Sequence, residues 1–193
     1  EIARAKHHIH IQYYIFCDDE TGRRLRDALV EKVRQGVEVR ILYDDVGCSG
    51  VKKDFFEGMR REGIEVFSFL HVKFPLFTSK VNYRNHRKIG GMNVADRYVR
   101  GTGWGSWRDT HFRIEGSGAA GLQVSFLSDW SATTKQHITG AAYFPQSERH
   151  AENILQIVPS GPFGQWRALL QADSYAVSNA RRRIWIQTPY YLP

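Results

Sequence analysis

The chain has 193 residues, 42% of them hydrophobic and 24% charged, which is ordinary for a globular protein with a substantial core. Its net charge of +7 and its pI near 9.5 favour anionic partners such as phospholipid headgroups, nucleic acid or phosphate esters, although a merely solvated basic face stays open. No run of about 18 apolar residues occurs, which excludes a membrane-spanning helix within these residues.

The two cysteines, Cys17 and Cys48, are too few for a disulfide framework and lack the spacing of metal ligands. They favour a reducing compartment, with a disulfide left open. The first residues, 1–6, have the pattern of the last turns of a helix, and they do not resemble a signal peptide. We therefore expect the chain to start by truncation within a longer element.

Apolar periodicity predicts alternating strands and helices over the first 70 residues. The expected elements are a strand at 8–16, a helix at 22–35, a strand at 37–43, a helix at 51–62 and a strand at 64–70. Asp18, Asp19 and Thr21 offer N-cap chemistry for the first helix. This order favours a parallel sheet with right-handed crossovers, and therefore an α/β fold.

The second part of the chain is less regular. The expected elements are a basic and aromatic loop at 73–84, turns at 97–108, a strand at 109–115, a helix at 117–130, a loop at 131–152, a strand at 154–158, a helix at 164–180 and a strand from Arg182. The loop at 74–84, with Trp104 and Trp107, is either a membrane-docking surface or an ordinary loop core.

A short internal repeat indicates a duplicated α/β unit. Residues 5–12 align with residues 180–187 at a constant offset, and both copies contain a basic cluster, an alternating strand and a final glutamine. We predict a first half over residues 1–179 and the start of a second, truncated half over residues 180–193. A chance match between two amphipathic strands is the alternative.

The stretch from Asn85 to Asn93 holds the strongest candidates for chemistry. In an extended backbone, His86 and Lys88 point to the same face. A neutral imidazole there can be a nucleophile toward phosphorus or a general base, while lysine and amide groups stabilise a phosphoryl transition state. A carboxylate beside the imidazole, for which Asp109 is a candidate, fixes the tautomer of the ring.

These residues resemble bacterial cardiolipin synthases of the phospholipase D superfamily, specifically their N-terminal catalytic half. The H-x-K motif is His86 to Lys88, and Gly90 to Asn93 match the G-G-x-N that ends the family signature. The matching segments follow the family order over residues 7–16, 21–29, 36–44, 82–89, 90–98, 107–116, 157–162 and 186–193. The resemblance implies a phospholipase D-like α/β/α sandwich with a mixed, mainly parallel central sheet.

By the same resemblance, His86, Lys88 and Asp109 are the expected catalytic residues. Lys88 and Asn93 are expected to hold the substrate phosphate, and Tyr83 and His111 are possible lining residues. No metal and no cofactor is expected, because such enzymes use a phosphohistidine intermediate.

The implied reaction joins two phosphatidylglycerol molecules into cardiolipin and releases glycerol. Its implied partners are anionic phospholipid, a membrane surface, and a second phospholipase D-like half or a homodimer that supplies the other histidine. Nucleic acid is not an expected partner. The implied location is the bacterial cell membrane, reached peripherally or through an anchor outside this chain. The alternatives are a phospholipase D-type phosphodiesterase or nuclease, and an inactive module that binds phosphate or membranes.

The chain departs from the family pattern between Ile89 and Gly90. About ten residues of the signature, including its aspartate, have no counterpart at this point. They would form a strand and a turn, and the deletion of a central strand removes ladder hydrogen bonds and core packing. We therefore expect that the molecule contains residues here that the sequence does not show.

Several other polar residues have competing interpretations. His7, His8 and His10 form a cluster, but without an acid or cysteine at ligand spacing an ordinary strand face is favoured over a metal site. Asp44 and Asp45 end a parallel strand, where α/β sites gather, yet helix capping is the stronger interpretation.

Overall fold

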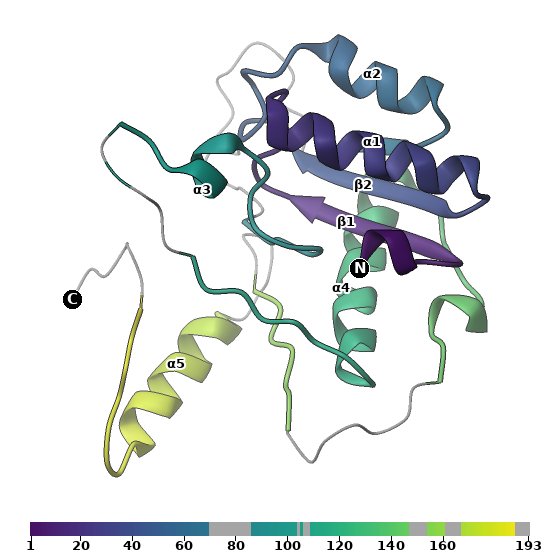
Figure 1. Cartoon of the computed structure of the whole chain (residues 1–193). Coiled ribbons are helices and arrows are strands. Elements are labelled where there is room, and N and C mark those ends of the chain that lie inside the picture. Colours follow the sequence, from purple (N-terminus) through teal and green to yellow (C-terminus); the bar gives the residue numbers. More distant parts are fainter. Residues whose placement is uncertain (70–85, 104, 106–108, 147–153, 161–166, 188–193) are drawn as a thin grey trace. The chain divides into compact units, whose positions relative to one another are not determined.

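We analysed a computed structural model of the whole chain, in which the described residues are 1–69, 86–103, 105, 109–146, 154–160 and 167–187. The chain divides into two compact units, Glu1–Ile157 and Val158–Pro193, which are treated separately below. Figure 1 shows the elements of both units. Within the described residues, no helix combines the length and the apolar character needed to cross a membrane.

A three-stranded parallel sheet forms the centre of the first unit. Its strands are β1 (His8–Tyr13), β2 (Glu38–Asp44) and β3 (Glu65–Phe69), in the order β1-β2-β3 (Figure 1). The parallel sheet predicted from the sequence is therefore confirmed, with strand ends that differ by a few residues.

Two helices cover one face of the sheet. They are α1 (Glu20–Arg34) and α2 (Lys53–Arg61), and their apolar stripes pack on the side chains of the strands. Leu29, Ile41 and Met59, one from each of three elements, are fully buried in this layer. The predicted helices are confirmed: amphipathic periodicity marks both, and N-cap chemistry marks α1 as well. Of the three candidate caps it is Asp19 whose Oδ1 accepts a hydrogen bond from the Gly22 amide, at 3.0 Å.

The opposite face is covered by α4 (Gly118–Thr134). Leu42 points to this side, whereas Ile41 points to the other, as the alternation of a strand requires. Phe126 and Trp130 of α4 are fully buried against Leu42 and Phe67. The result is an α/β/α arrangement, as predicted, with α4 longer than the expected helix at 117–130.

Three short elements complete the first unit. They are the 3-10 turn η1 (Ile2–Arg4), the helix α3 (Asp96–Arg100) and the 3-10 turn η3 (Ala141–Tyr143). The helical end expected at residues 1–6 is thus a single 3-10 turn. The turns predicted at 97–108 are wrong for residues 97–100, which belong to α3. Residues 104 and 106–108, and with them Trp104 and Trp107, lie outside the described residues, as does the whole loop at 73–84.

Three predicted strands are wrong. Residues 109–115 and the described residues 154–158 and 182–187 have no strand structure. Ile154 has 98% of its surface exposed, and Phe112 has 87%. Alternating apolar residues produce a strand only where a neighbour completes the hydrogen-bond ladder, and the described part of the chain provides none at these positions.

The second unit contains one described helix, α5 (Ala168–Asn179), which lies within the helix predicted at 164–180. The proposed repeat, with a boundary between residues 179 and 180, stays a prediction. Residues 188–193, the end of the presumed second copy, lie outside the described residues.

Candidate active site

The predicted catalytic stretch lies beside the carboxyl end of β1. Ile89 and Gln12 form an antiparallel bridge, in which the Gln12 amide donates to the Ile89 carbonyl at 3.0 Å and the Ile89 amide donates to the Gln12 carbonyl at 2.9 Å. Along this stretch the exposed His86 and Lys88 alternate with the less exposed Arg87 and Ile89. The imidazole and the ammonium therefore share the outer face, as the alternation predicted.

His86 stacks on the ring of Tyr14, with 4.0 Å between ring centroids and 24° between the planes. Partial burial lowers the pKa of His86 below its ordinary value, and the charge of Lys88 lowers it further, while Asp44 opposes both effects. The imidazole is consequently neutral near pH 7, which is the form that attacks an electrophile.

Lys88 lies close to two site residues. Its Nζ donates a hydrogen bond to the backbone carbonyl of His86, at 2.9 Å. Partial burial lowers the pKa of Lys88, and the carboxylate of Asp109 acts in the opposite direction. The lysine thus combines a hydrogen bond that holds it at the motif with a cationic head on the exposed face, where an anion can approach it.

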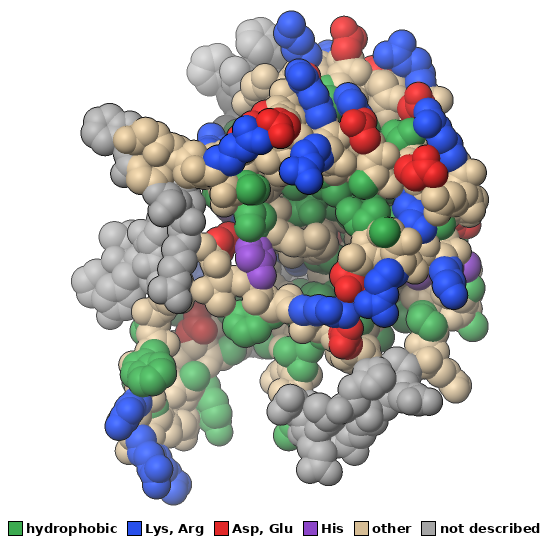
Figure 2. Space-filling model, viewed as in Figure 1, with side chains coloured by type: hydrophobic (Ala, Val, Ile, Leu, Met, Phe, Trp, Pro, Cys, Tyr) green, Lys and Arg blue, Asp and Glu red, His purple; other side chains and the backbone are tan. Residues whose placement is uncertain are grey.

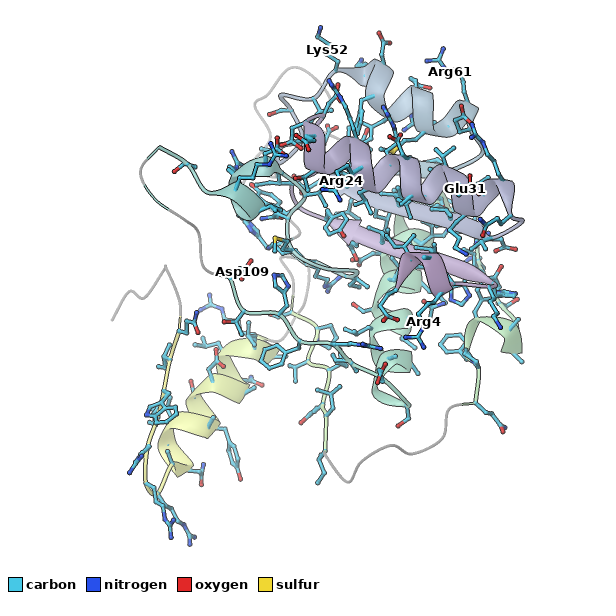
Figure 3. The ribbon with its side chains drawn as sticks, in the orientation of Figure 1. Arg4, Arg24, Glu31, Lys52, Arg61 and Asp109 are labelled. Atoms are coloured by element: carbon cyan, nitrogen blue, oxygen red, sulfur yellow. The ribbon has the colours of Figure 1, made fainter. Side chains whose placement is uncertain are left out.

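Asp109 and His111 lie on the exposed segment that precedes α4, and Asp109 is labelled in Figure 3. His111 Nε2 is 3.7 Å from Asp109 Oδ2. Asp109 therefore contacts His111 and raises the pKa of Lys88, whereas the carboxylate whose charge raises the pKa of His86 is Asp44. The orienting role expected for Asp109 stays a prediction, and Tyr83 lies outside the described residues.

Asp44 is a buried residue at the end of β2. Its Oδ1 accepts hydrogen bonds from the backbone amides of Val46 and Gly47, both at 2.9 Å, and only 1% of its surface is exposed. Asp44 therefore caps a turn, and the predicted helix capping is wrong for this residue, because α2 begins after Lys52 without a side-chain cap. The charge of Asp44 also raises the pKa of His86, an influence that the sequence signalled only through the position of Asp44 at the carboxyl end of a parallel strand.

Arg87 and Asp129 anchor the catalytic stretch to α4. Arg87 donates to Asp129 Oδ2 at 2.5 Å, and the side-chain amide of Gln12 donates to the same oxygen at 2.7 Å. Asp129 is buried, so this shared acceptor joins the motif, β1 and the opposite helix. The sequence analysis did not assign either residue to the site. It could have indicated Arg87, because in an extended backbone this residue points to the face opposite His86 and Lys88.

Asn93 is buried beneath the site. Its Oδ1 accepts a hydrogen bond from the Ile15 amide at 3.1 Å, and its Nδ2 donates to the Tyr98 hydroxyl at 3.2 Å. The side chain therefore holds the loop that follows β1, and its predicted role in binding phosphate stays a prediction. Gly90 and Gly91 have φ of +104° and +138°, a region of backbone conformation that favours glycine.

The histidine cluster occupies the other end of β1. The His10 ring stacks on Phe126 with 4.5 Å between centroids, and its Nδ1 is 2.9 Å from Gln123 Oε1. Burial lowers the pKa of His10 to about 4. Among the described residues no group of three or more metal-ligating side chains converges. His10 is thus a core-facing histidine that packs against α4.

Cys17 and Cys48 are both free thiols. Burial raises the pKa of Cys48 to about 12, and its sulfur accepts a hydrogen bond from the Phe16 amide at 3.2 Å. The disulfide that the sequence left open is therefore not formed in this structure. Cys48 packs behind the loop that carries Tyr14.

Comparison with known proteins identifies the family of the chain. Residues 1–103 match the family model described as "Cardiolipin synthase, PLD-like domain". The chain is 39% identical over 206 residues to the major cardiolipin synthase ClsA of Bacillus subtilis (strain 168), and 38% identical over 205 residues to cardiolipin synthase 2 of Bacillus anthracis. It is 36% identical to the cardiolipin synthase of Geobacillus kaustophilus (strain HTA426).

These alignments include the whole chain but only 43%, 40% and 41% of the three relatives, so the chain spans about two fifths of their length. The alignments are longer than the 193 residues of the chain, which means that the relatives have positions without a counterpart here. No solved structure matches. The matched residues include the sheet, both flanking helices and the His86–Lys88 stretch, and the chain belongs to the phospholipase D-like domain family of the cardiolipin synthases.

Proposed function

We propose that this chain forms the N-terminal catalytic part of a phosphatidyltransferase that joins two phosphatidylglycerol molecules into cardiolipin and glycerol. One observation carries the proposal. A neutral imidazole, His86, lies on the same exposed face as an ammonium, Lys88, at the carboxyl end of a parallel strand. The family membership of the chain supports this reading of the geometry.

In the first step, a ring nitrogen of His86 attacks the phosphorus of phosphatidylglycerol. A nitrogen–phosphorus bond forms, the bond from phosphorus to the glycerol oxygen breaks, and glycerol leaves after it takes up a proton. Lys88 lies where its charge stabilises the phosphoryl oxygens of the transition state. In the second step, a hydroxyl of another phosphatidylglycerol attacks the phosphohistidine, loses its proton and restores His86.

The proton for glycerol comes from a second histidine in this proposal. A second phospholipase D-like half, or a second copy of the chain in a homodimer, supplies it. The much greater length of the relatives supports the first source. Because the substrate is a lipid, the enzyme works at a bacterial membrane surface, which fits the net charge of +7 and its attraction to anionic headgroups.

The test is incubation of the protein with phosphatidylglycerol vesicles, followed by lipid extraction and mass spectrometry. We expect cardiolipin from the native protein and a loss of at least about a hundredfold in His86→Ala, because the nucleophile is removed. The matched control is His137→Ala, which removes an exposed histidine hydrogen-bonded to Ser131 at 3.0 Å and should leave the rate unchanged. Cardiolipin formation that persists in His86→Ala would refute the assigned nucleophile.

A second candidate function, that of a non-catalytic phosphate-binding or membrane-binding module, rests on the direct junction of Ile89 and Gly90. The signature aspartate is missing there. The same incubation separates the candidates. Binding to anionic vesicles with neither cardiolipin nor phosphatidic acid as a product would favour the module, whereas phosphatidic acid alone would indicate hydrolysis by water.

A further inference from the structure

A basic pocket lies apart from the exposed face of His86. Its volume is about 570 Å³, and it is lined by Arg23, Lys52 and Arg97 together with Cys17, Asp18 and Gly47. The three cations come from three different elements, because Arg23 is in α1, Lys52 precedes α2 and Arg97 is in α3. We refer to this concavity as the basic pocket.

Cations outnumber carboxylates three to one among the residues that line the basic pocket. Asp18 is the one carboxylate among the lining residues, and Arg23 Nε donates to it at 2.7 Å. In the described part of the chain, the side chain of Lys52 has no hydrogen bond or ion pair, and Arg97 makes a cation–π contact with Tyr98. Two cationic heads therefore have no anionic partner among the residues that the structure describes.

The neighbouring acids are already engaged by the backbone. Asp19 accepts hydrogen bonds from the amides of Gly22 and Asp96, and Asp96 accepts from the amide and the hydroxyl of Thr21. These bonds hold both carboxylates in the junction between α1 and α3. Figure 2 shows that basic side chains are numerous over α1 and α2 and are interspersed with acids, so the convergence of three cations on one concavity is a local feature.

Tyr14 lies between the basic pocket and the candidate active site. A Cβ on Gly47, which lines the pocket, would lie 1.9 Å from the Tyr14 carbonyl oxygen, so only glycine permits this approach. The Tyr14 ring stacks in turn on His86. A ligand in the pocket would thus be adjacent to the catalytic stretch without occupying the face on which His86 and Lys88 meet.

We propose that the basic pocket binds the phosphate group of a phosphate ester, at a site separate from the phosphorus that His86 attacks. Arginine offers a planar pair of donors that fits two phosphate oxygens, and lysine adds a compact charge. The volume is sufficient for a phosphate with a small polar substituent such as glycerol. This inference does not depend on the proposed reaction, because binding is measured without turnover.

The test compares two double variants of the full chain. Lys52→Gln with Arg97→Gln removes the two cations that have no anionic partner in the pocket. Arg24→Gln with Arg61→Gln removes the same charge from the exposed surfaces of α1 and α2, outside the pocket, and serves as the control (Figure 3). Thermal unfolding of both variants should match that of the native protein, since all four side chains act at the surface.

Calorimetric titration with inorganic phosphate and with glycerol 3-phosphate provides the first readout. We expect the pocket variant to bind at least about tenfold more weakly, because two charge-assisted contacts are lost, and the control variant to bind within about twofold of the native protein. An equal loss of affinity in the two variants would show that net charge alone is responsible, and it would overturn the proposal.

A vesicle arm distinguishes the source of the phosphate. Native protein and both variants are sedimented with vesicles of phosphatidylcholine alone and of phosphatidylcholine with phosphatidylglycerol. A loss of binding to the anionic vesicles that is specific to the pocket variant assigns the pocket to a lipid headgroup. A loss confined to the soluble esters assigns it to a free phosphate ester. The absence of a pocket-specific loss in every arm contradicts the site.

Discussion

At the scale of single residues, the environment decides what each histidine can do. His86 is partly exposed beside Lys88 and stays available as a neutral base, whereas His10 is packed on Phe126 and bonded to Gln123. Both rings have a lowered pKa, and in both cases burial is the largest cause. Burial therefore keeps one ring neutral at the candidate active site and the other neutral in the core at the opposite end of β1.

His10 should make the stability of the fold depend on pH. Its pKa is about 4 in the folded protein and about 6.5 when unfolded, so the unfolded chain binds more protons between these values. The groups that face it are His8, Arg40, Glu38 and Gln123. Stability should fall as pH falls through this window, by about 2 kcal/mol from pH 7 to pH 5.

Urea unfolding of the native protein and of His10→Gln at these two pH values checks this prediction. The variant retains a polar side chain but cannot be protonated, so its stability should change less between the two conditions. The pKa of His8 is also lowered, so His8 adds a loss of stability at the lower pH in both proteins. Equal declines in the two proteins would show that His10 is not the responsible group.

Asp44→Asn should lower the pKa of His86 further. The amide oxygen can still accept from the Val46 and Gly47 amides, so the turn is retained, but the negative charge that favours the imidazolium is lost. Titration of the His86 ring protons by NMR measures the shift. Asp45→Asn is the neighbouring control. An unchanged or raised pKa in Asp44→Asn would contradict an electrostatic role for Asp44.

At the scale of elements, the predictions succeeded where two independent signals agreed. The helix α1 has both an apolar stripe and the Asp19 cap, and β2 is a near-continuous apolar run followed by a turn. The predicted strand at 109–115 had alternation alone. Alternation describes which side chains share a face, but it does not reveal whether a neighbouring strand exists to complete the ladder.

The junction of α4 with the catalytic stretch should be sensitive to Asp129→Ala. The substitution leaves the side-chain donors of Gln12 and Arg87 without their shared acceptor, and we expect a loss of about 3 kcal/mol in the free energy of unfolding. Asp27→Ala removes an exposed acid paired with Arg26 and should cost less than about 0.5 kcal/mol. Urea midpoints of the two variants provide the comparison, and equal midpoints would contradict the anchoring role.

At the scale of the whole molecule, much of the candidate site was predictable because its motif is local. His86, Lys88 and the glycines lie within a few residues, so period-two alternation sufficed to place the imidazole and the ammonium together. Asp44 and Asp129 were not assigned to the site, because their contacts with the motif connect residues about forty positions apart and arise only from tertiary packing. Sequence spacing alone carries no information about such contacts.

The curated relatives are more than twice as long as the region that they share with this chain. They extend well beyond the matched region, and they have positions that this chain lacks within it. We predict that about ten residues of the family signature are missing after Ile89. The alignments, which are longer than the chain, agree that the chain lacks positions found in its relatives. The place of these missing positions in the chain stays a prediction. A peptide map of the purified protein by mass spectrometry, across the junction of Ile89 and Gly90, determines whether those residues exist.

The double use of Gln12 has a consequence for the order in which the protein folds. Its backbone holds Ile89, and its side chain holds the acceptor on α4 that also binds Arg87. Residues 12, 89 and 129 are far apart in the chain, so these bonds close long loops, and the entropy cost of closure favours their formation after local contacts. The reactive stretch therefore acquires its register late, and unassembled intermediates do not present an aligned imidazole and ammonium.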